Sequence, residues 1–543
     1  MTEEKSISSK KLFLSGVTAM TVSTIIVKVI GLLYKIPMLS LLKEGGMAYF
    51  NAAYDIYTMF YLVSTAGLPV AVSILVSENR VHGNVKNIKR IYRTAMTMFI
   101  VIGGIGTVAM MAGAKLFSSA ISISGAEYCI LAIAPTLFMI CISSAFRGYF
   151  QGHQIMKYTA ISQVIEALGK LLIGILLASF ALKKWNSYPI AAAFAVMGLS
   201  IGSAVAMLYL AFSKFIFRVS GKEKATTDDS GLEPESRKRI IARLIKIAIP
   251  ITVSSTVMGT TRLADTFFIV RRLVDAGFAK EASEVFYGVY STIVSIYNLP
   301  PAIITGIGLS IVPMLTSAIE ARSREKESMV LSSSLRLCTL FATPCAIGVI
   351  LFSKPILQLL FSNQEDTISI GAPLLSSLGI SIIFACLITV TNAILQAYKQ
   401  ERKPIISMGV GALVKIVFDY VLIGIKGINI YGAPISTFLC NVAVVALNFY
   451  YIKKYASGFD GIIKLFYRPL GAAVISVGAA FGVYALICSY LGTSRIYTIA
   501  CVALAAVLYV LAAMLMRAVD EEDIKMLPKG EKIYSLLHKI KLI

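Results

Sequence analysis

The residues of this sequence that could do chemistry are ionisable side chains inside long apolar runs, where a membrane-spanning helix would carry them into a low-dielectric layer. Nine residues are of this kind: Lys28, Lys35, Asp55, Glu166, Lys170, Arg262, Asp265, Lys415 and Asp419. Facing lipid, each would cost roughly 2.5–3.5 kcal/mol and the nine together on the order of 25 kcal/mol, beyond the roughly 5–15 kcal/mol that keeps a protein folded. We therefore expect them to face one another or water, lining a polar cavity that binds a substrate.

The spacing of four of these residues allows pairing within one helix. Glu166 and Lys170 are four residues apart, as are Lys415 and Asp419, and side chains at this spacing are neighbours on a helix surface. Ion pairs that only fix helix packing are therefore one interpretation of these four residues, and substrate binding is the other.

The first two lysines have no such partner nearby. Lys28 and Lys35 are seven residues apart, so they share one face of a helix on which no obvious acidic partner stands. This absence favours a functional role for them, although Asp55 could pair with Lys35 from the following segment.

The roles of Arg262 and Arg147 stay open. Arg262 and Asp265 lie about 60° apart around their helix, so they can pair with each other or take part in a site. Arg147 is expected at the cytoplasmic rim, near Lys157, where a solvated position is the simpler interpretation.

The motifs of several enzyme classes are missing from the sequence. It has no GxxxxGK[ST] phosphate loop, no HExxH motif and no CxxC pair. The three histidines fall in predicted polar loops or the tail, and the eight cysteines lie within apolar runs as small core residues. We therefore expect no metal site, no cofactor and no catalysis, and transport becomes the default function.

Composition supports a membrane protein with many spans. Of the 543 residues 57% are hydrophobic and only 15% are charged, and the mean hydropathy is +0.78. The formal net charge of +22 comes from basic residues that punctuate the apolar runs without forming a continuous face. Attraction to an anionic inner leaflet explains this charge better than nucleic-acid binding does, and we expect no nucleic-acid partner.

About fourteen segments are long and apolar enough to cross a bilayer, which needs about 20 residues each. The first two are joined by a turn expected at Gly45-Gly46, and Pro300-Pro301 predicts a kink or break in the eighth. The segments are 13–40, 47–78, 92–114, 127–149, 157–182, 188–213, 244–270, 286–317, 330–353, 371–396, 404–426, 430–452, 467–490 and 495–516.

The connections between these segments alternate in charge. Basic residues gather after the even-numbered segments, whereas Arg271-Arg272 is the main exception in the odd-numbered connections. By the positive-inside rule both termini are expected in the cytoplasm. The expected organisation is a cytoplasmic tail (1–12), an N-terminal lobe (13–213), a cytoplasmic linker (214–243), a C-terminal lobe (244–452), a helix pair (453–516) and a cytoplasmic amphipathic tail (517–543).

The two halves of the chain resemble each other. Residues 146–177 align with residues 391–422 at a constant shift, which pairs Ser162 with Ser407 and Lys170 with Lys415. Each half holds six segments, so both halves enter the membrane in the same orientation. The fold expected from this repeat is all-α, with two six-helix lobes related by a pseudo-two-fold axis along the membrane normal and two extra C-terminal helices.

Three motifs carry a resemblance to a known family. KVIGLLYKIP from Lys28, STAGLPVAVSILVSE from Ser64 and FRGYFQGHQIMKYTAISQ from Phe146 resemble the SpoVB/YtgP-like polysaccharide biosynthesis proteins. These are relatives of the MurJ lipid II flippases within the multidrug/oligosaccharidyl-lipid/polysaccharide exporter superfamily. The resemblance covers nearly the whole chain, and it implies two six-helix lobes around a central cavity, with the last two spans shaping a groove for a lipid tail.

The same resemblance implies a site. Lys28 falls where MurJ-type proteins carry a cavity arginine, whereas Asp55 and Ser295 replace two other cavity arginines. Tyr297 and Pro300 match the family pattern. This sequence therefore departs from the MurJ pattern at two of three cationic positions, which favours the SpoVB/YtgP branch and leaves the cargo open.

The leading hypothesis is a flippase for an undecaprenyl-diphosphate-linked cell-wall oligosaccharide in the bacterial cytoplasmic membrane. Its partners would be the lipid-linked saccharide, membrane lipids and cell-wall synthesis proteins. One alternative is a MATE-type exporter of drugs or metabolites that uses Asp55 or Asp265 to bind H⁺ or Na⁺. Another is a scaffold for cell-wall assembly that transports nothing, which the buried charges disfavour.

Overall fold

The computed structural model describes residues 2–219, 233–456, 462–516 and 518, and the regular structure in these ranges is helical throughout. The helices before the 220–232 gap are α1 (Thr2–Thr65), α2 (Leu68–Val81), α3 (Val85–Ala112), α4 (Ala114–Ala120), α5 (Ala126–Gly152), α6 (Met156–Trp185) and α7 (Tyr188–Val219). Those after it are α9 (Arg237–Asp275), α10 (Lys280–Tyr297), α11 (Leu299–Glu320), α12 (Arg324–Leu360), α13 (Glu365–Ala397), α14 (Arg402–Ile423), the 3₁₀ turn η1 (Asn429–Tyr431), α15 (Gly432–Tyr455), α16 (Ile462–Leu491) and α17 (Arg495–Leu515).

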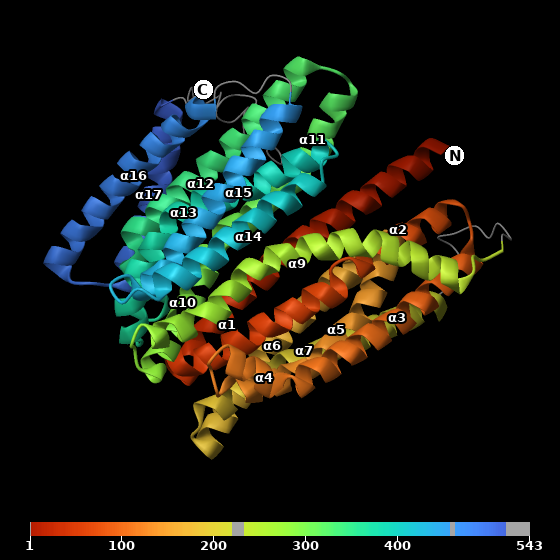
Figure 1. Ribbon diagram of the computed structural model, residues 1–543. Helices are drawn as coiled ribbons and strands as arrows, with labels where there is room; N and C mark the ends of the chain where they lie inside the picture. The colour runs from red at the N-terminus through yellow and green to blue at the C-terminus, as the bar shows by residue number, and fades with distance from the viewer. Residues whose placement is uncertain (1, 220–232, 457–461, 517, 519–543) are drawn as a thin grey trace. The chain divides into compact units, whose positions relative to one another are not determined.

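The chain folds into two compact units. Unit 1 consists of Met1–Val274 and Ala279–Gly288, and unit 2 of Asp275–Phe278 and Val289–Ile543. Each unit contains long helices packed side by side, as Figure 1 shows for α3, α5 and α7 in unit 1 and for α12, α13 and α15 in unit 2. Helix α9 packs with unit 1, although the repeat assigns this segment to the second lobe. The six-helix lobes remain a prediction from the repeat.

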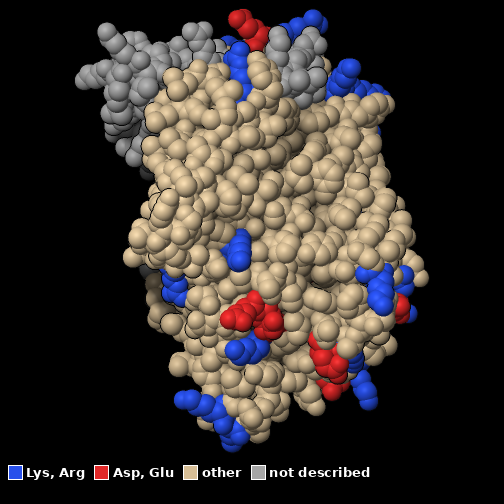
Figure 2. All heavy atoms as spheres, turned by 90° about the vertical axis from the view of Figure 1, so that its left-hand side faces the viewer, with Lys and Arg blue, Asp and Glu red and all other residues tan. Residues whose placement is uncertain are grey.

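The protein is an all-α membrane protein with many spans, as expected. Among the described residues, twelve helical stretches are long and apolar enough to cross a membrane. The difference from fourteen lies in two places: the first two predicted spans fall in one stretch, Val22–Val81, and the eighth, which begins in α10 and continues in α11, is not among the twelve. Figure 2 shows a broad band with few Lys, Arg, Asp or Glu side chains between two ends where these side chains gather, the surface pattern of a membrane-embedded protein.

The first helical hairpin turns at a different residue from the one predicted. The non-helical residue inside α1 is Lys43, with φ 58° and ψ −177°, so the expectation of a turn at Gly45-Gly46 was wrong. Helix α10 covers this break at Gly288, where a Cβ atom would lie 2.0 Å from the carbonyl oxygen of Glu44. Only glycine allows the two backbones to approach so closely.

The predicted break at Pro300-Pro301 is confirmed. Helix α10 ends at Tyr297, and α11 begins at Leu299 after the single residue Asn298. A proline in the first turn of a helix removes an N–H group that has no intrahelical partner there, so Pro300 and Pro301 are tolerated at the start of α11.

Close packing of α6 on α7 positions the lysine of α6. A Cβ atom on Gly198 of α7 would lie 2.3 Å from Cα of Gly174, and one on Gly169 would lie 2.4 Å from Cα of Gly202. Small residues let membrane helices approach in this way. Lys170 lies between Gly169 and Gly174 on α6, and a Cβ atom on Gly174 would lie 3.2 Å from the hydroxyl of Tyr34 in α1, so Lys170 is carried toward α1.

In unit 2 the last two helices pack on α12. Phe352 of α12 shares a core with Tyr484 of α16 and Cys501 of α17, and Figure 1 shows α16 and α17 beside α12. These are the two helices that the sequence analysis placed outside the repeat.

Candidate functional site

Unit 1 contains most of the charged residues singled out in the sequence. Lys28, Lys35 and Asp55 come from α1, Arg262 and Asp265 from α9, Glu166 and Lys170 from α6, and Arg147 from α5. Lys415 and Asp419 lie on α14 in unit 2.

An ion pair between α1 and α9 lies at the centre of the unit 1 group. Nε of Arg262 is 2.5 Å from Oδ1 of Asp55, and the side chains are 39% and 4% exposed, respectively. The hydroxyls of Thr266 and Tyr287 donate hydrogen bonds of 2.9 and 3.2 Å to Oδ2 of the same carboxylate. Asp55 is thus held by three groups, whereas the Arg262 side chain remains partly exposed.

Three lysines lie near this arginine. The Arg262 guanidinium is close enough to repel the ammonium groups of Lys28, Lys35 and Lys170, and Asp55 attracts that of Lys35. Lys28 is exposed at the surface of the chain, and Lys35 and Lys170 are partly buried. We call these four cations, with Asp55, the cation cluster. Its formal charge is strongly positive, which favours an anion.

Lys170 is held by aromatic rings. Its Nζ atom lies 5.0 Å from the ring centre of Tyr34, 5.5 Å from that of Phe50 and 4.3 Å from that of Tyr54. The Arg262 guanidinium lies 6.0 Å from the Tyr54 ring, so this ring faces two cations. Ring faces stabilise a desolvated cation without cancelling its charge. These rings were not predicted from the sequence, although Phe50 and Tyr54 stand four residues apart on one helix face.

Glu166 pairs with Arg147, and the spacing had offered Lys170 as its partner. Nη2 of Arg147 is 3.0 Å from Oε2 of Glu166, and Nε donates a 3.1 Å hydrogen bond to Ser162. Arg147 is buried, in contrast to the solvated position expected for it. The Arg147–Glu166 pair therefore links α5 to α6 and neutralises the acidic group closest in sequence to Lys170.

Asp265 is buried on α9, and electrostatic interactions place it near Arg262 and Tyr287. It therefore lies beside the cation cluster. The arginine itself pairs with Asp55, so the ion pair described here joins two helices, whereas the sequence spacing had offered one within α9.

Lys415 and Asp419 form the ion pair that their spacing allows. Nζ of Lys415 is 3.3 Å from Oδ2 of Asp419, and the side chains are 3% and 0% exposed. Lys415 also donates hydrogen bonds to Ser436 (3.3 Å) and Thr437 (3.0 Å), and Ser436 donates to Asp419. The two lysines that the repeat relates thus differ: Lys415 faces a carboxylate and hydroxyls, and Lys170 faces ring carbons.

Metal-ligating side chains do not cluster in the described ranges. Among those residues, no group of three or more His, Cys, Asp or Glu could hold a metal ion.

Comparison with known proteins places this arrangement in a family. The sequence profile of the polysaccharide biosynthesis protein family matches residues 13–319. The chain belongs to this family. A second profile, MatE, matches residues 263–421.

Several curated relatives of this chain come from Bacillus subtilis (strain 168). The chain is 25% identical to "Lipid II flippase MurJ" over 82% of its own length and 83% of that protein. It is also 25% identical to "Uncharacterized membrane protein YabM" over 96% of both chains, and 23% identical to "Stage V sporulation protein B" over 96% of its own length and 98% of that protein.

Solved structures share the fold at low sequence identity. A lipid II flippase MurJ in an inward closed conformation matches with a TM-score of 0.68 and 15% identity, covering 91% of this chain and 98% of that one. An inward-facing MATE family multidrug transporter of the MOP superfamily matches with a TM-score of 0.60 and 16% identity, covering 78% and 98%. The fold is therefore shared with a lipid II flippase and with a multidrug transporter, and these likenesses do not identify a cargo for this chain.

Proposed function

We propose that this protein is a flippase that moves an undecaprenyl-diphosphate-linked cell-wall oligosaccharide, such as the peptidoglycan precursor, across the bacterial cytoplasmic membrane. The observation that carries the proposal is the cation cluster, in which Arg262 pairs with Asp55 and lies near three lysines inside a unit built of spanning helices. A diphosphate that crosses a low-dielectric layer needs buried cations, and charge-assisted hydrogen bonds to phosphate oxygens are among the strongest in proteins.

The geometry of Arg262 suits this role. Its contact with Asp55 uses Nε, which leaves N–H groups on the other edge of the planar guanidinium to donate to phosphate oxygens. Asp55 fixes the orientation of the guanidinium, and Thr266 and Tyr287 fix Asp55. An acidic residue at position 55 therefore supports a cation from α9, where MurJ-type proteins have a cation of their own at that position.

Lys28 and Lys170 differ from Arg262 in how they are held. Lys28 is exposed, and Lys170 is stabilised by ring faces that leave its charge uncancelled. In the proposed site Arg262 is the fixed cation, and the two lysines add further cations for the diphosphate.

Movement of the cargo would follow from alternating access between the two lobes, with the site open to one face of the membrane at a time. The sequence has no phosphate loop for ATP, so the membrane potential or an H⁺ or Na⁺ gradient would drive the cycle. We place both termini in the cytoplasm, with membrane lipids and cell-wall synthesis proteins as partners.

A second candidate is a MATE-type exporter coupled to H⁺ or Na⁺. It is favoured by the MatE profile over residues 263–421 and by the shared fold of the multidrug transporters. Asp265, which is buried beside the cluster, and Asp55 are the acidic candidates for binding the coupling ion.

A reconstitution experiment separates the two functions. Purified protein in liposomes should move fluorescent lipid II from one leaflet to the other, and Arg262→Gln should reduce this movement at least about tenfold, the effect of losing about 1.4 kcal/mol of binding. Efflux of an organic cation from the same liposomes, with no movement of lipid II, would reject the flippase and support the exporter.

A further inference from the structure

Helix α9 lies along α1 and α2 over most of its length. Arg262 meets Asp55, a Cβ atom on Gly259 would lie 2.5 Å from the Leu62 side chain, and one on Gly67 would lie 2.1 Å from the carbonyl oxygen of Ala248. The residue numbers fall on α9 as they rise on α1 and α2, so α9 runs antiparallel to them. The next contact in this series is at the beginning of α9.

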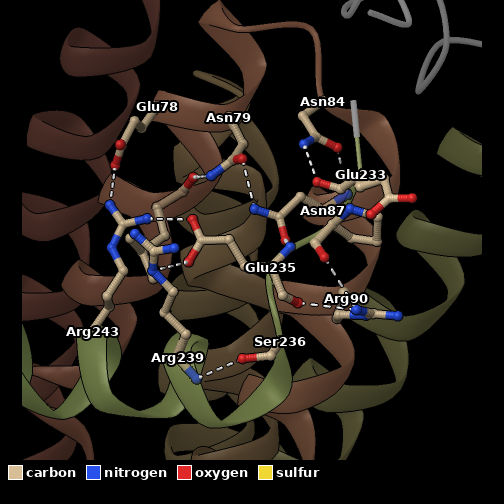
Figure 3. Close-up of polar contacts among 12 residues, drawn as sticks. Glu78, Asn79, Asn84, Asn87, Arg90, Glu233, Glu235, Ser236, Arg239 and Arg243 are labelled. Carbon is tan, nitrogen blue, oxygen red and sulfur yellow. Dashed lines mark hydrogen bonds and ion pairs between the residues drawn. The ribbon is translucent and has the colours of Figure 1, made fainter. Parts of the chain in front are cut away.

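There the α2–α3 turn, by which we mean Asn79 at the end of α2 through Arg90 at the start of α3, holds the backbone of residues 233–235, which precede α9 (Figure 3). Nδ2 of Asn84 donates to the carbonyl of Glu233 (3.2 Å), and Nη1 of Arg90 donates to those of Pro234 (3.3 Å) and Glu235 (3.0 Å). The N–H of Glu235 donates to Oδ1 of Asn87 (3.0 Å). Four hydrogen bonds to main-chain atoms make this turn a binding site for an extended segment of the same chain.

Hydrogen bonds within the turn hold its side chains in position for this contact. Asn84 accepts a 2.9 Å hydrogen bond from the backbone N–H of Asn87 and so caps the start of α3. Asn87 donates to Asn79 (2.8 Å), and Asn79 donates to the carbonyl of Leu75 (2.8 Å). This chain of amides fixes the oxygen of Asn87 that receives the Glu235 N–H.

Two ion pairs add to the backbone contacts. Arg243 places Nη2 2.6 Å from Glu78 of α2 and Nη1 2.7 Å from Glu235, as Figure 3 shows. The side chains of Arg243 and Glu78 are 32% and 43% exposed. Exposed pairs contribute about 0–1 kcal/mol each and weaken with salt. This end of α9 is therefore held by solvent-accessible ion pairs of Arg243 and by hydrogen bonds to the buried amides of Asn84 and Asn87.

We propose that the α2–α3 turn and residues 233–236 form a latch, closed in this structure, that opens during the transport cycle and releases the beginning of α9 from α2. The chain continues from α9 into unit 2 at Asp275, and the repeat assigns α9 to the second lobe. A helix shared in this way needs a releasable attachment to unit 1 if the lobes alternate. The opening rests on the proposed transport function, and the closed latch does not.

Distances between spin labels at two exposed positions test the latch without any substrate. The labels replace Lys86 of α3 and Lys238 of α9, in a full-length chain whose eight native cysteines are substituted, in lipid nanodiscs. Two distances should be present, one for the closed and one for the open latch. Arg243→Gln or Asn87→Ala should raise the population at the longer distance at least about threefold, because each removes contacts of the closed form. Arg239→Gln is the matched control: Arg239 is 76% exposed, and its Nε lies 3.7 Å from Glu235.

A salt titration tests the latch in the labelled protein without further substitutions, so its result does not depend on whether the variants fold. Raising the salt from about 0.05 to about 1 M should shift the population toward the longer distance, because it screens the exposed ion pairs. A single short distance that neither salt nor Arg243→Gln alters would overturn the latch. Failure of lipid II movement with two distances present would reject the flippase and keep the latch.

Discussion

Arg262 of α9 and Asp55 of α1 form an ion pair in which one partner is buried and the other is partly open, with 2.5 Å between Nε and Oδ1. The pair joins two helices far apart in sequence, and its contact on the arginine is Nε. An arginine held in this manner can bind an anion without losing its own support. The proposed diphosphate site depends on this arrangement.

Replacing Asp55 should show how much the Asp55–Arg262 pair contributes to the stability of the fold. Asp55→Ala leaves Arg262 without its counter-ion and the hydroxyls of Thr266 and Tyr287 without an acceptor, which should cost about 1–3 kcal/mol of stability. Asp55→Asn keeps an acceptor for both hydroxyls and should cost less. Thermal unfolding of the purified variants measures both, and an unchanged melting temperature for Asp55→Ala would show that the pair does not stabilise α9.

Lys28 should matter for activity and not for folding, because it is exposed and belongs to the cation cluster. Lys28→Ala should abolish complementation of a strain that lacks the protein, while the amount of protein in the membrane stays the same. Lys184→Ala is the control, because Lys184 is also exposed but lies over the rings of Phe180 and Trp185. Normal growth with Lys28→Ala would remove this residue from the site.

The buried Lys415–Asp419 pair should behave as a unit. Asp419→Asn leaves a buried ammonium without its counter-ion, and breaking a buried pair in this way costs about 3–5 kcal/mol. The double variant Lys415→Met with Asp419→Leu should recover much of that loss, because it removes both charges. Thermal unfolding of the two variants measures the difference. If the double variant is as unstable as Asp419→Asn, the charges are not compensating each other.

Labelling of cysteines at two lysine positions tests the orientation of the chain in the membrane. Lys238→Cys in α9 should react with a membrane-impermeant maleimide only after cells are permeabilised, because the basic connections are predicted to face the cytoplasm. Lys426→Cys, between α14 and α15, should react in intact cells. The reverse pattern would invert the proposed orientation.

The membrane class and the approximate span count could be read from the sequence because spanning helices are long, apolar and separated by charged connections. The break at Asn298 followed from Pro300-Pro301, whose effect on a helix is local. The turn at Lys43 was missed, because glycine permits a turn without requiring one. The carbonyl of Glu44 approaches Gly288 of a distant helix there, and no sequence pattern encodes that contact.

The sequence allowed us to choose the charged residues of the candidate site. It did not allow us to predict which of them pair with one another. Spacing detects neighbours on one helix, so Lys415–Asp419 could be foreseen. The partners of Asp55 and Glu166 stand on other helices, and their identity depends on how α9 packs on α1 and how α5 packs on α6. The rings around Lys170 were hidden for a related reason, because aromatic residues in a spanning helix look like ordinary apolar ones.

The central claim is that the protein moves a lipid-linked cell-wall precursor across the membrane. Depletion of this protein in its host, followed by labelling of lipid-linked cell-wall precursors that are accessible at the outer face of the membrane, tests it most directly. The proposed function predicts that outer-face precursor falls as the protein is lost and that precursor accumulates on the cytoplasmic face. Unchanged outer-face precursor, together with a fall in organic-cation efflux, would contradict it.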